Sequence, residues 1–266
     1  DRDDGRAPLP SFIEKEAIER INFVKRAIMN ADAVNTVSET YREEIMTRDF
    51  GEDLHRMLKN RENIVFGIVN GIDYNEYNPL TDPGLYRHYS VKSVSRKRDN
   101  KIWLQKHYGL KKGFNIPLLC MTSRIVEQKG FALLLPILST LMESGAMMII
   151  MGDGAEEIKK LLAEVSKNFP EQLIYTPFDS SRETSLYAAS DIFILPSRFE
   201  PCGVNQLIAL RYGCIPVVHH IGGLADTITN FDPRTETGNG FTFAGYDSNN
   251  LLVALARAIE TYKHKD

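Results

Sequence analysis

Cysteine is scarce in this chain. Its 266 residues include three cysteines, Cys120, Cys202 and Cys214, an odd number without the close spacing of metal ligands. The sequence therefore predicts neither a disulfide framework nor a cysteine-based metal centre. A reducing compartment, the cytoplasm, is the expected location.

Long apolar runs and a strong excess of one charge are also missing. The longest apolar segment, Phe131–Leu138, is far shorter than the ~20 residues of a membrane span, and no signal peptide is expected. The formal net charge of −3 gives no general attraction to nucleic acid or to an anionic membrane, so neither is expected as a partner. The five cations of Lys92–Lys101 are interpreted as a solvated linker or a helix start.

What the chain does contain is a regular alternation of strands and helices from Pro117 onward. Nearly all-apolar strands separated by helices indicate a parallel sheet covered on both faces. We therefore predict an α/β fold with a complete Rossmann-like domain. The predicted strands are Leu118–Thr122, Met147–Met151, Leu173–Thr176, Ile192–Leu195, Ile215–Val218 and Phe241–Phe243. The predicted helices are Lys97–Tyr108, Phe131–Met142, Glu156–Asn168, Ser181–Ala189, Val204–Tyr212, Leu224–Asn230 and Asn249–Tyr262.

The beginning of the chain has fewer such elements. Ser11–Glu14 has the pattern of a capping box, and short strands are predicted at Ala33–Val37 and Ile64–Val69. Two strands cannot form a matching sheet, so we expect a partial N-terminal domain with a connection over 1–78 and a C-terminal domain over 79–266. The polar start without an initiator Met is typical of a fragment or a processed product.

Two cations follow the first strand of the predicted sheet. Arg124 and Lys129 lie five residues apart, just before Gly130 and a helix. Ligands of open α/β sheets bind at the carboxyl ends of the strands. There, an Arg fork and a Lys point charge can hold a diphosphate and stabilise a departing nucleoside diphosphate. The alternative is that both are ordinary surface cations.

The turn after Ile192–Leu195 is the most informative part of the sequence. In Pro196-Ser-Arg-Phe-Glu-Pro-Cys-Gly-Val-Asn-Gln206 a strand turns tightly into a helix start, where Gly203 allows close approach of a phosphate. Glu200 can accept hydrogen bonds from sugar hydroxyls or interact with the helix dipole. Cys202 is a candidate nucleophile, but a buried thiol is the favoured interpretation because no His or Asp is near in sequence.

Two other turns are rich in glycine. Gly152 and Gly154 permit a tight turn, either for its own sake or for the approach of a ligand. Gly222 and Gly223 precede a helix, which again suits phosphate. The neighbouring pair His219-His220 is not expected to bind a metal, because adjacent strand residues point to opposite faces. Several strands thus end in polar or glycine-rich turns on one rim, which favours binding of a nucleotide or a sugar phosphate.

Together these segments resemble the bacterial glycogen synthase and starch synthase family. The resemblance extends from about Asn30 to Tyr262 in the right order. The matching segments are Thr36–Ser38, Asn70–Asp73, Asn78-Pro79, Ser123-Arg124, Gln128–Gly130, Pro196–Gly203 with Gln206, and Gly222–Thr227.

This resemblance implies a GT-B fold, with two Rossmann-like domains facing each other across a cleft. It implies retaining transfer of glucose from ADP-glucose to the non-reducing 4-OH of an α-1,4-glucan, without a metal or a cofactor. Arg124 and Lys129 would hold the donor diphosphate and Glu200 would contact the donor sugar. The expected donor-binding residues are Gly152, Gly154, Tyr175, Cys202, Gly203, Val204, Asn205, Gly222 and Gly223, with Tyr175 and Tyr187 as candidates for stacking on adenine.

The chain departs from the family at several points. The Lys-x-Gly-Gly-Leu motif and the catalytic His of the N-terminal domain are absent, so most of the acceptor domain is expected to be missing. Asn205 stands where relatives commonly have Thr, and His219 and His220 where they often have Arg. Ile208 occupies the position at which other retaining transferases have a second Glu.

Two alternatives remain open from the sequence. The missing N-terminal motifs are compatible with a non-catalytic module that binds a nucleotide sugar or a glucan. The fold is also compatible with a GT-B transferase that uses a UDP-sugar, although the phrase around Glu200 and the absent second Glu argue against it.

Overall fold

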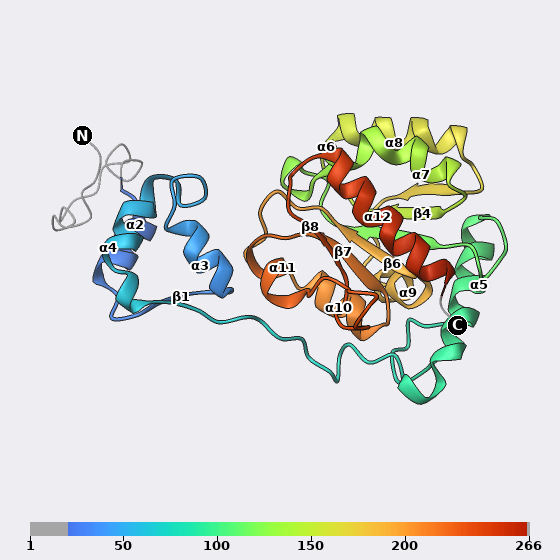
Figure 1. Ribbon diagram of the computed structural model, residues 1–266, viewed down its shortest axis with the longest axis horizontal. Helices are drawn as coiled ribbons and strands as arrows, with labels where there is room; N and C mark the ends of the chain where they lie inside the picture. The colour runs from blue at the N-terminus through green and yellow to red at the C-terminus, as the bar shows by residue number, and fades with distance from the viewer. Residues whose placement is uncertain (1–20, 265–266) are drawn as a thin grey trace. The chain divides into compact units, whose positions relative to one another are not determined.

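The computed structural model describes residues 21–264, and the predicted capping box at Ser11–Glu14 lies outside them. Contacts divide the chain into an N-terminal unit, Asp1–Val69, and a C-terminal unit, Asn70–Asp266. Figure 1 shows both units. The domain boundary predicted after residue 78 stays a prediction.

The described part of the N-terminal unit holds two strands, which form a parallel pair, β1 (Val34–Thr36) and β2 (Val65–Gly67). The Ser38 hydroxyl accepts the backbone N–H of Tyr41 and so caps α3. A small core of Met46, Leu58 and Val65 holds these elements together. The helices are α2 (Phe23–Asn30), α3 (Glu39–Ile45) and α4 (His55–Asn60), with 3-10 turns η1 (Glu52–Leu54) and η2 (Glu62–Ile64).

The C-terminal unit is built on a parallel sheet whose six strands run in the order β5-β4-β3-β6-β7-β8. The strands are β3 (Leu118–Thr122), β4 (Met147–Met151), β5 (Leu173–Thr176), β6 (Ile192–Leu195), β7 (Ile215–His219) and β8 (Phe241–Phe243). All six were predicted, and β7 is one residue longer than expected. Chain order reverses between β3 and β6, which is where open α/β sheets bind their ligands.

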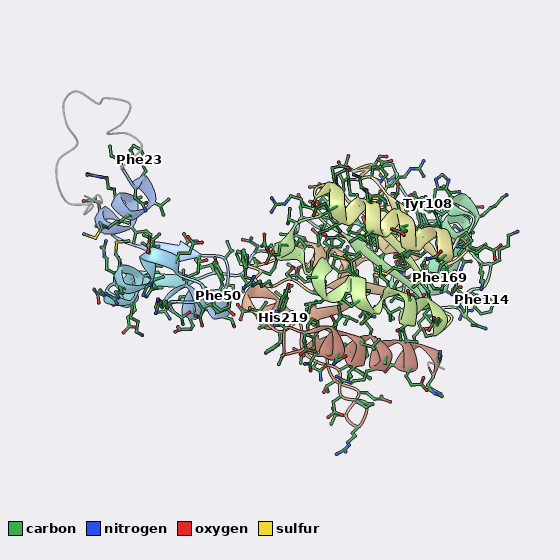
Figure 2. The ribbon with its side chains drawn as sticks, turned by 90° about the horizontal axis from the view of Figure 1, so that it is seen from above. Phe23, Phe50, Tyr108, Phe114, Phe169 and His219 are labelled. Atoms are coloured by element: carbon green, nitrogen blue, oxygen red, sulfur yellow. The ribbon has the colours of Figure 1, made fainter. Side chains whose placement is uncertain are left out.

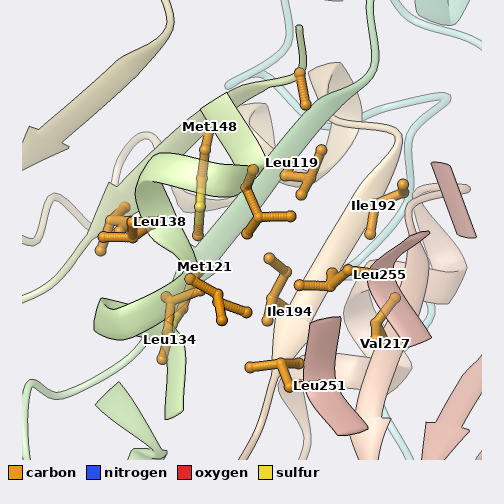
Figure 3. Close-up of a cluster of buried hydrophobic side chains, with 14 of the residues drawn as sticks. Leu119, Met121, Leu134, Leu138, Met148, Ile192, Ile194, Val217, Leu251 and Leu255 are labelled. Atoms are coloured by element: carbon orange, nitrogen blue, oxygen red, sulfur yellow. The ribbon is translucent and has the colours of Figure 1, made fainter. Parts of the chain in front are cut away.

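Helices cover both faces of this sheet because each strand sends alternate apolar side chains to opposite sides. Leu119 and Met121 of β3 join the core beneath α6 (Phe131–Leu134), α7 (Leu138–Glu143), α8 (Glu156–Asn168) and α12 (Ser248–Lys263). Figure 3 shows side chains of this core in close-up. Leu118 and Cys120 join the core beneath the other helices. These are α5 (Lys97–Tyr108), α9 (Glu183–Ala189), α10 (Asn205–Arg211) and α11 (Gly222–Thr227).

Two predicted helices differ most from the structure, whereas the ends of the other predicted helices lie within two residues of those observed. The helix expected over Phe131–Met142 is divided by the 3-10 turn η5 (Leu135–Ile137), because Pro136 has no N–H to donate. The helix expected over Leu224–Asn230 ends earlier, at Thr227. There the Asn239 side chain bonds the backbone on both sides of the helix end, accepting from Thr229 N–H and donating to Thr227 C=O.

The basic cluster Lys92–Lys101 corrects another expectation. It does contain a helix start, since 3-10 turn η3 (Val91–Arg96) leads into α5. It is not simply a solvated face, however. Lys97 Nζ donates to the carbonyls of Tyr187, Ala188 and Tyr212. The Lys101 side chain is 3% exposed and pairs with Asp191 at 2.5 Å.

Candidate functional site

The loops after β3 and β6 meet at the switch point of the sheet. Arg198 donates its backbone N–H to Gln128 C=O at 2.8 Å, and the Gln128 side chain donates to Phe199 C=O at 3.0 Å. Gly130 has φ +77°, and a Cβ there would lie 2.0 Å from Pro196 O. Glycine at 130 is therefore what lets these loops come so close.

This contact brings together two of the three residues expected to hold the donor diphosphate and the donor sugar. Lys129 Nζ lies 2.5 Å from Glu200 Oε2, and both side chains are largely buried. Ser197 Oγ donates to the same oxygen at 2.9 Å. Glu200 Oε1 receives no hydrogen bond from the described residues, so it can accept one from a ligand hydroxyl. The third residue, Arg124, follows β3 on the surface and its guanidinium has no acceptor within the described part of the chain.

Ser197 and His219 support Glu200, and sequence reasoning missed both roles. His219, labelled in Figure 2, ends β7 and is buried. Its Nδ1 lies 2.8 Å from Ser197 O and its Nε2 lies 3.2 Å from Ala244 O. His220 is exposed, so the two histidines do point to different sides, as predicted. The only sequence signal for Ser197 was its place three residues before Glu200.

In the other turns, close packing between loops explains the presence of glycine at 152, 154 and 223. A Cβ on Gly152 would lie 2.1 Å from Ser123 O, and one on Gly154 would lie 2.2 Å from Ile125 O. Their lack of side chains lets the turn after β4 pack on the loop after β3. A Cβ on Gly223 would lie 2.2 Å from Cys202 Cα, which brings the turn after β7 against the turn after β6. The neighbouring Gly222 has φ +47°. Their roles in donor binding stay predictions.

The turn after Glu200 has a buried inner side. Cys202 is 3% exposed, and burial raises the pKa of its thiol above the usual value, which favours a protonated thiol over a nucleophile. Gly203 takes φ +71° and Val204 is the N-cap of α10. The Asn205 side chain donates to Thr122 C=O at 3.2 Å and so ties the start of α10 to the end of β3.

The two tyrosines proposed to stack on a base differ in accessibility. Tyr187 is 0% exposed and lies against Phe193, so the interpretation of Tyr187 as a stacking residue is wrong. It belongs to the core because it lies on the face of α9 that packs on the sheet. Tyr175 is partly exposed at the end of β5, and its hydroxyl donates to Gly152 C=O at 3.3 Å.

A hollow of about 500 Å³ opens at the opposite edge of the sheet, where strands begin, and no motif pointed to it. Its lining includes Lys97, Phe114, Ile215 and Tyr262. Figure 2 shows Phe114 and His219 at opposite ends of the C-terminal unit. This hollow is therefore distinct from the switch point.

Residues 21–264 lack two further features. They contain no group of three or more His, Cys, Asp or Glu side chains that could hold a metal ion. None of their helices is both long and apolar enough to cross a membrane.

Comparison with known proteins connects this geometry to a family. Residues 108–266 match the glycosyl transferases group 1 family, and residues 6–60 match the starch synthase catalytic domain. A glycogen synthase of Thermosipho melanesiensis is 43% identical over 97% of this chain and 54% of that protein. A glycogen synthase of Fervidobacterium nodosum is 40% identical over 98% and 54%. The catalytic domain of starch synthase IV from Arabidopsis thaliana, bound to ADP and acarbose, is 36% identical with a TM-score of 0.86, over 91% of this chain and 51% of that one.

The chain belongs to the glycogen synthase and starch synthase family. The predicted resemblance and the predicted α/β fold of GT-B type are both confirmed. This synthase-family chain spans about half the length of the curated relatives it matches. A sucrose-phosphate synthase of Thermosynechococcus elongatus, 17% identical with a TM-score of 0.63 over 94% of this chain and 55% of that one, shares the fold alone.

Proposed function

We propose that the C-terminal unit is the donor-binding half of a retaining glucosyltransferase. The whole enzyme would move glucose from ADP-glucose to the non-reducing 4-OH of an α-1,4-glucan. The observation that carries this proposal is the meeting of Lys129 and Glu200 at the switch point, 2.5 Å apart. A cation for phosphate and a carboxylate for sugar hydroxyls are there within reach of a single sugar nucleotide.

Each member of this pair has its own proposed role. Lys129 would bind the donor diphosphate and stabilise the charge that develops on the leaving ADP. Glu200 has Oε1 available to accept a hydrogen bond from the donor sugar, while Ser197 and Lys129 orient Oε2. Arg124, exposed on the same rim, would supply a second charge to the diphosphate.

The phosphates would also meet backbone N–H groups of the turn after β6. Gly203, Val204 and Asn205 form this turn, and φ +71° at Gly203 makes it tight. This position for the distal phosphate is what the family resemblance implies, and it is supported by the similarity of this chain to the ADP-bound starch synthase IV catalytic domain.

The chemistry would need no nucleophile from this unit. The pKa of the Cys202 thiol is raised by burial, and Ile208, which occupies the second-carboxylate position, is buried and apolar. The departing phosphate would take up the acceptor proton on the face from which it leaves, which gives retention. The acceptor glucan and the missing part of the N-terminal domain would complete the site in the whole protein. The cytoplasmic location stays a prediction.

One alternative is a chain that binds the donor and transfers nothing by itself. It is favoured by the absence of the N-terminal motifs from the sequence. Recovery of glucose transfer to a maltooligosaccharide by this chain alone would rule it out. A UDP-sugar donor is the other alternative, and a competition between UDP and ADP decides it.

Calorimetric titration with ADP, ADP-glucose and UDP tests the proposal. We expect ADP and ADP-glucose to bind more tightly than UDP, and Lys129→Ala to weaken ADP binding at least tenfold. Lys106→Ala, which removes an exposed lysine of α5, is the matched control and should bind like the unaltered chain. Absence of ADP binding by the unaltered chain, or equal binding by Lys129→Ala, would contradict the proposed site.

A further inference from the structure

The Gln206 side chain occupies the inner side of the turn that follows Glu200. It is 0% exposed. Its Nε2 donates to Cys202 C=O at 3.0 Å and to Gly203 C=O at 2.9 Å, and it lies 3.1 Å from Thr227 Oγ1. Three oxygens thus surround the two hydrogens of a single amide nitrogen.

These bonds fix the direction in which the turn presents its N–H groups. The chain has no cis peptide bond within its described residues, and in a trans peptide the C=O and N–H point in opposite directions. Because Gln206 holds the carbonyls of Cys202 and Gly203 inward, the N–H groups of the same two peptides, at Gly203 and Val204, point away from it. These are two of the groups on which the proposed function places the distal phosphate.

Gln206 also connects this turn to the turn after β7. Thr227 Oγ1 donates to Gly223 C=O at 2.6 Å, so it can only accept from Gln206. Gly223 donates its own N–H to Glu200 C=O at 3.0 Å. The amide of Gln206 therefore joins the two turns, and through Thr227 and Gly223 its network reaches the backbone carbonyl of Glu200.

The two halves of the Gln206 amide differ: the NH₂ group is fully used in hydrogen bonds, whereas the oxygen is not. Gln206 Oε1 is buried and has no hydrogen-bond partner among the described residues, a situation that ordinarily destabilises a protein. An apolar residue of similar size would avoid that cost but would leave the two inward carbonyls without a donor. What the position requires is the NH₂ group.

We propose that Gln206 is a positioning residue of the donor site, which holds the carbonyls of Cys202 and Gly203 inward and so aims the turn's N–H groups at the donor phosphate. This inference rests on the proposed function. Gln206 itself touches no substrate, and its effect passes through the backbone of the turn.

Gln206→Glu tests this role because it keeps the shape and removes the NH₂ group. The ionised carboxylate would face three oxygens, whereas the protonated carboxyl can donate one hydrogen bond to a carbonyl. Burial among oxygens disfavours the ionised form and so raises the pKa of the introduced carboxyl. We expect ADP to bind this variant at least tenfold more weakly than the unaltered chain at pH 8, and expect the difference to shrink by pH 6.

Gln105→Glu is the matched control. Gln105 is also 0% exposed, and its Nε2 donates to Gly113 C=O at 2.9 Å, away from the switch point. The same chemical change there should lower stability but leave ADP affinity within about twofold of the unaltered chain at both pH values. Unfolding followed by the fluorescence of Trp103, the only Trp of the chain, shows which variants are folded.

Thr227→Val is a milder second variant, in case Gln206→Glu does not fold. It removes one arm of the network and should weaken ADP binding about threefold. Folded variants at 206 and 227 that bind ADP like the unaltered chain would overturn the inference and leave the proposed function intact. Equal losses in Gln206→Glu and Gln105→Glu would also overturn it. Failure of the unaltered chain to bind ADP would refute the proposed function itself.

Discussion

Lys101→Met should strongly destabilise the C-terminal unit, although a basic cluster in a polar segment suggested a solvated residue. Lys101 Nζ bonds Asp191 Oδ2 at 2.5 Å, the carbonyls of Phe114 and Ile116 at 3.0 and 2.6 Å, and Tyr262 Oη at 2.9 Å. Met keeps the apolar stem but removes the charge. Asp191, whose side chain is 12% exposed, would keep the backbone N–H of Leu118 as a donor at 2.8 Å but would lose the ammonium group that balances its charge.

The expected cost follows from this geometry. Removing one partner of a buried ion pair typically costs about 3–5 kcal/mol. For a unit of this size, each kcal/mol corresponds to roughly 2–4 °C in Tm. The loss in Tm should therefore be about 6–20 °C.

Thermal and urea unfolding, followed by Trp103 fluorescence, measures the effect within the same unit. Lys106→Met, on the exposed side of α5, is the control and should lie within about 0.5 kcal/mol of the unaltered chain. The double variant Lys101→Met/Asp191→Asn should recover part of the loss, because no unpaired carboxylate remains. A single variant as stable as the Lys106→Met control would refute the reasoning.

Two further predictions concern the switch point and the thiols. Gly130 has φ +77°, and a Cβ there would lie 2.0 Å from Pro196 O. Gly130→Ala should therefore lower the free energy of unfolding by more than about 2 kcal/mol and weaken ADP binding. Gly109→Ala, with φ +69° and no neighbouring atom, should cost only about 1 kcal/mol, and equal losses in the two unfolding curves would contradict the packing argument. All three cysteines are buried, and burial raises the pKa of Cys202 and Cys214. The thiolate fractions of Cys202 and Cys214 should therefore stay low as the pH rises from 7 to 9. A disulfide reagent that labels thiols should react slowly until guanidinium unfolds the chain. Fast labelling of Cys202 at pH 7 would contradict its burial.

The sheet was predictable because its strands carry a local signal. Short apolar runs such as Met147–Met151, separated by helical periodicity, are typical of a parallel sheet, and the strand ends followed directly. The break at Pro136 was visible in principle, since proline lacks the N–H that a continuous helix needs. The burial of Lys101 was not, because its partner Asp191 lies 90 residues away and only the folded sheet brings them together.

The candidate site also has residues that were predictable from the sequence and residues that were not. The motif residues Lys129 and Glu200 were found because each follows a strand in a characteristic phrase. The supporting residues have no such phrase. His219 acts through Ser197 O from a neighbouring strand, and Gln206 acts through the carbonyls of its own turn. Tyr187 was misjudged because sequence does not show which face of a short helix is buried.

A crystal structure of this chain with ADP would test the central claim most directly. We expect the diphosphate at the carboxyl ends of β3 and β6, with a phosphate oxygen within hydrogen-bond distance of Lys129 Nζ and of the N–H groups at Gly203 and Val204. ADP bound instead in the hollow beside Phe114 and Ile215, or bound without contact to Lys129, would contradict the assignment of the donor site.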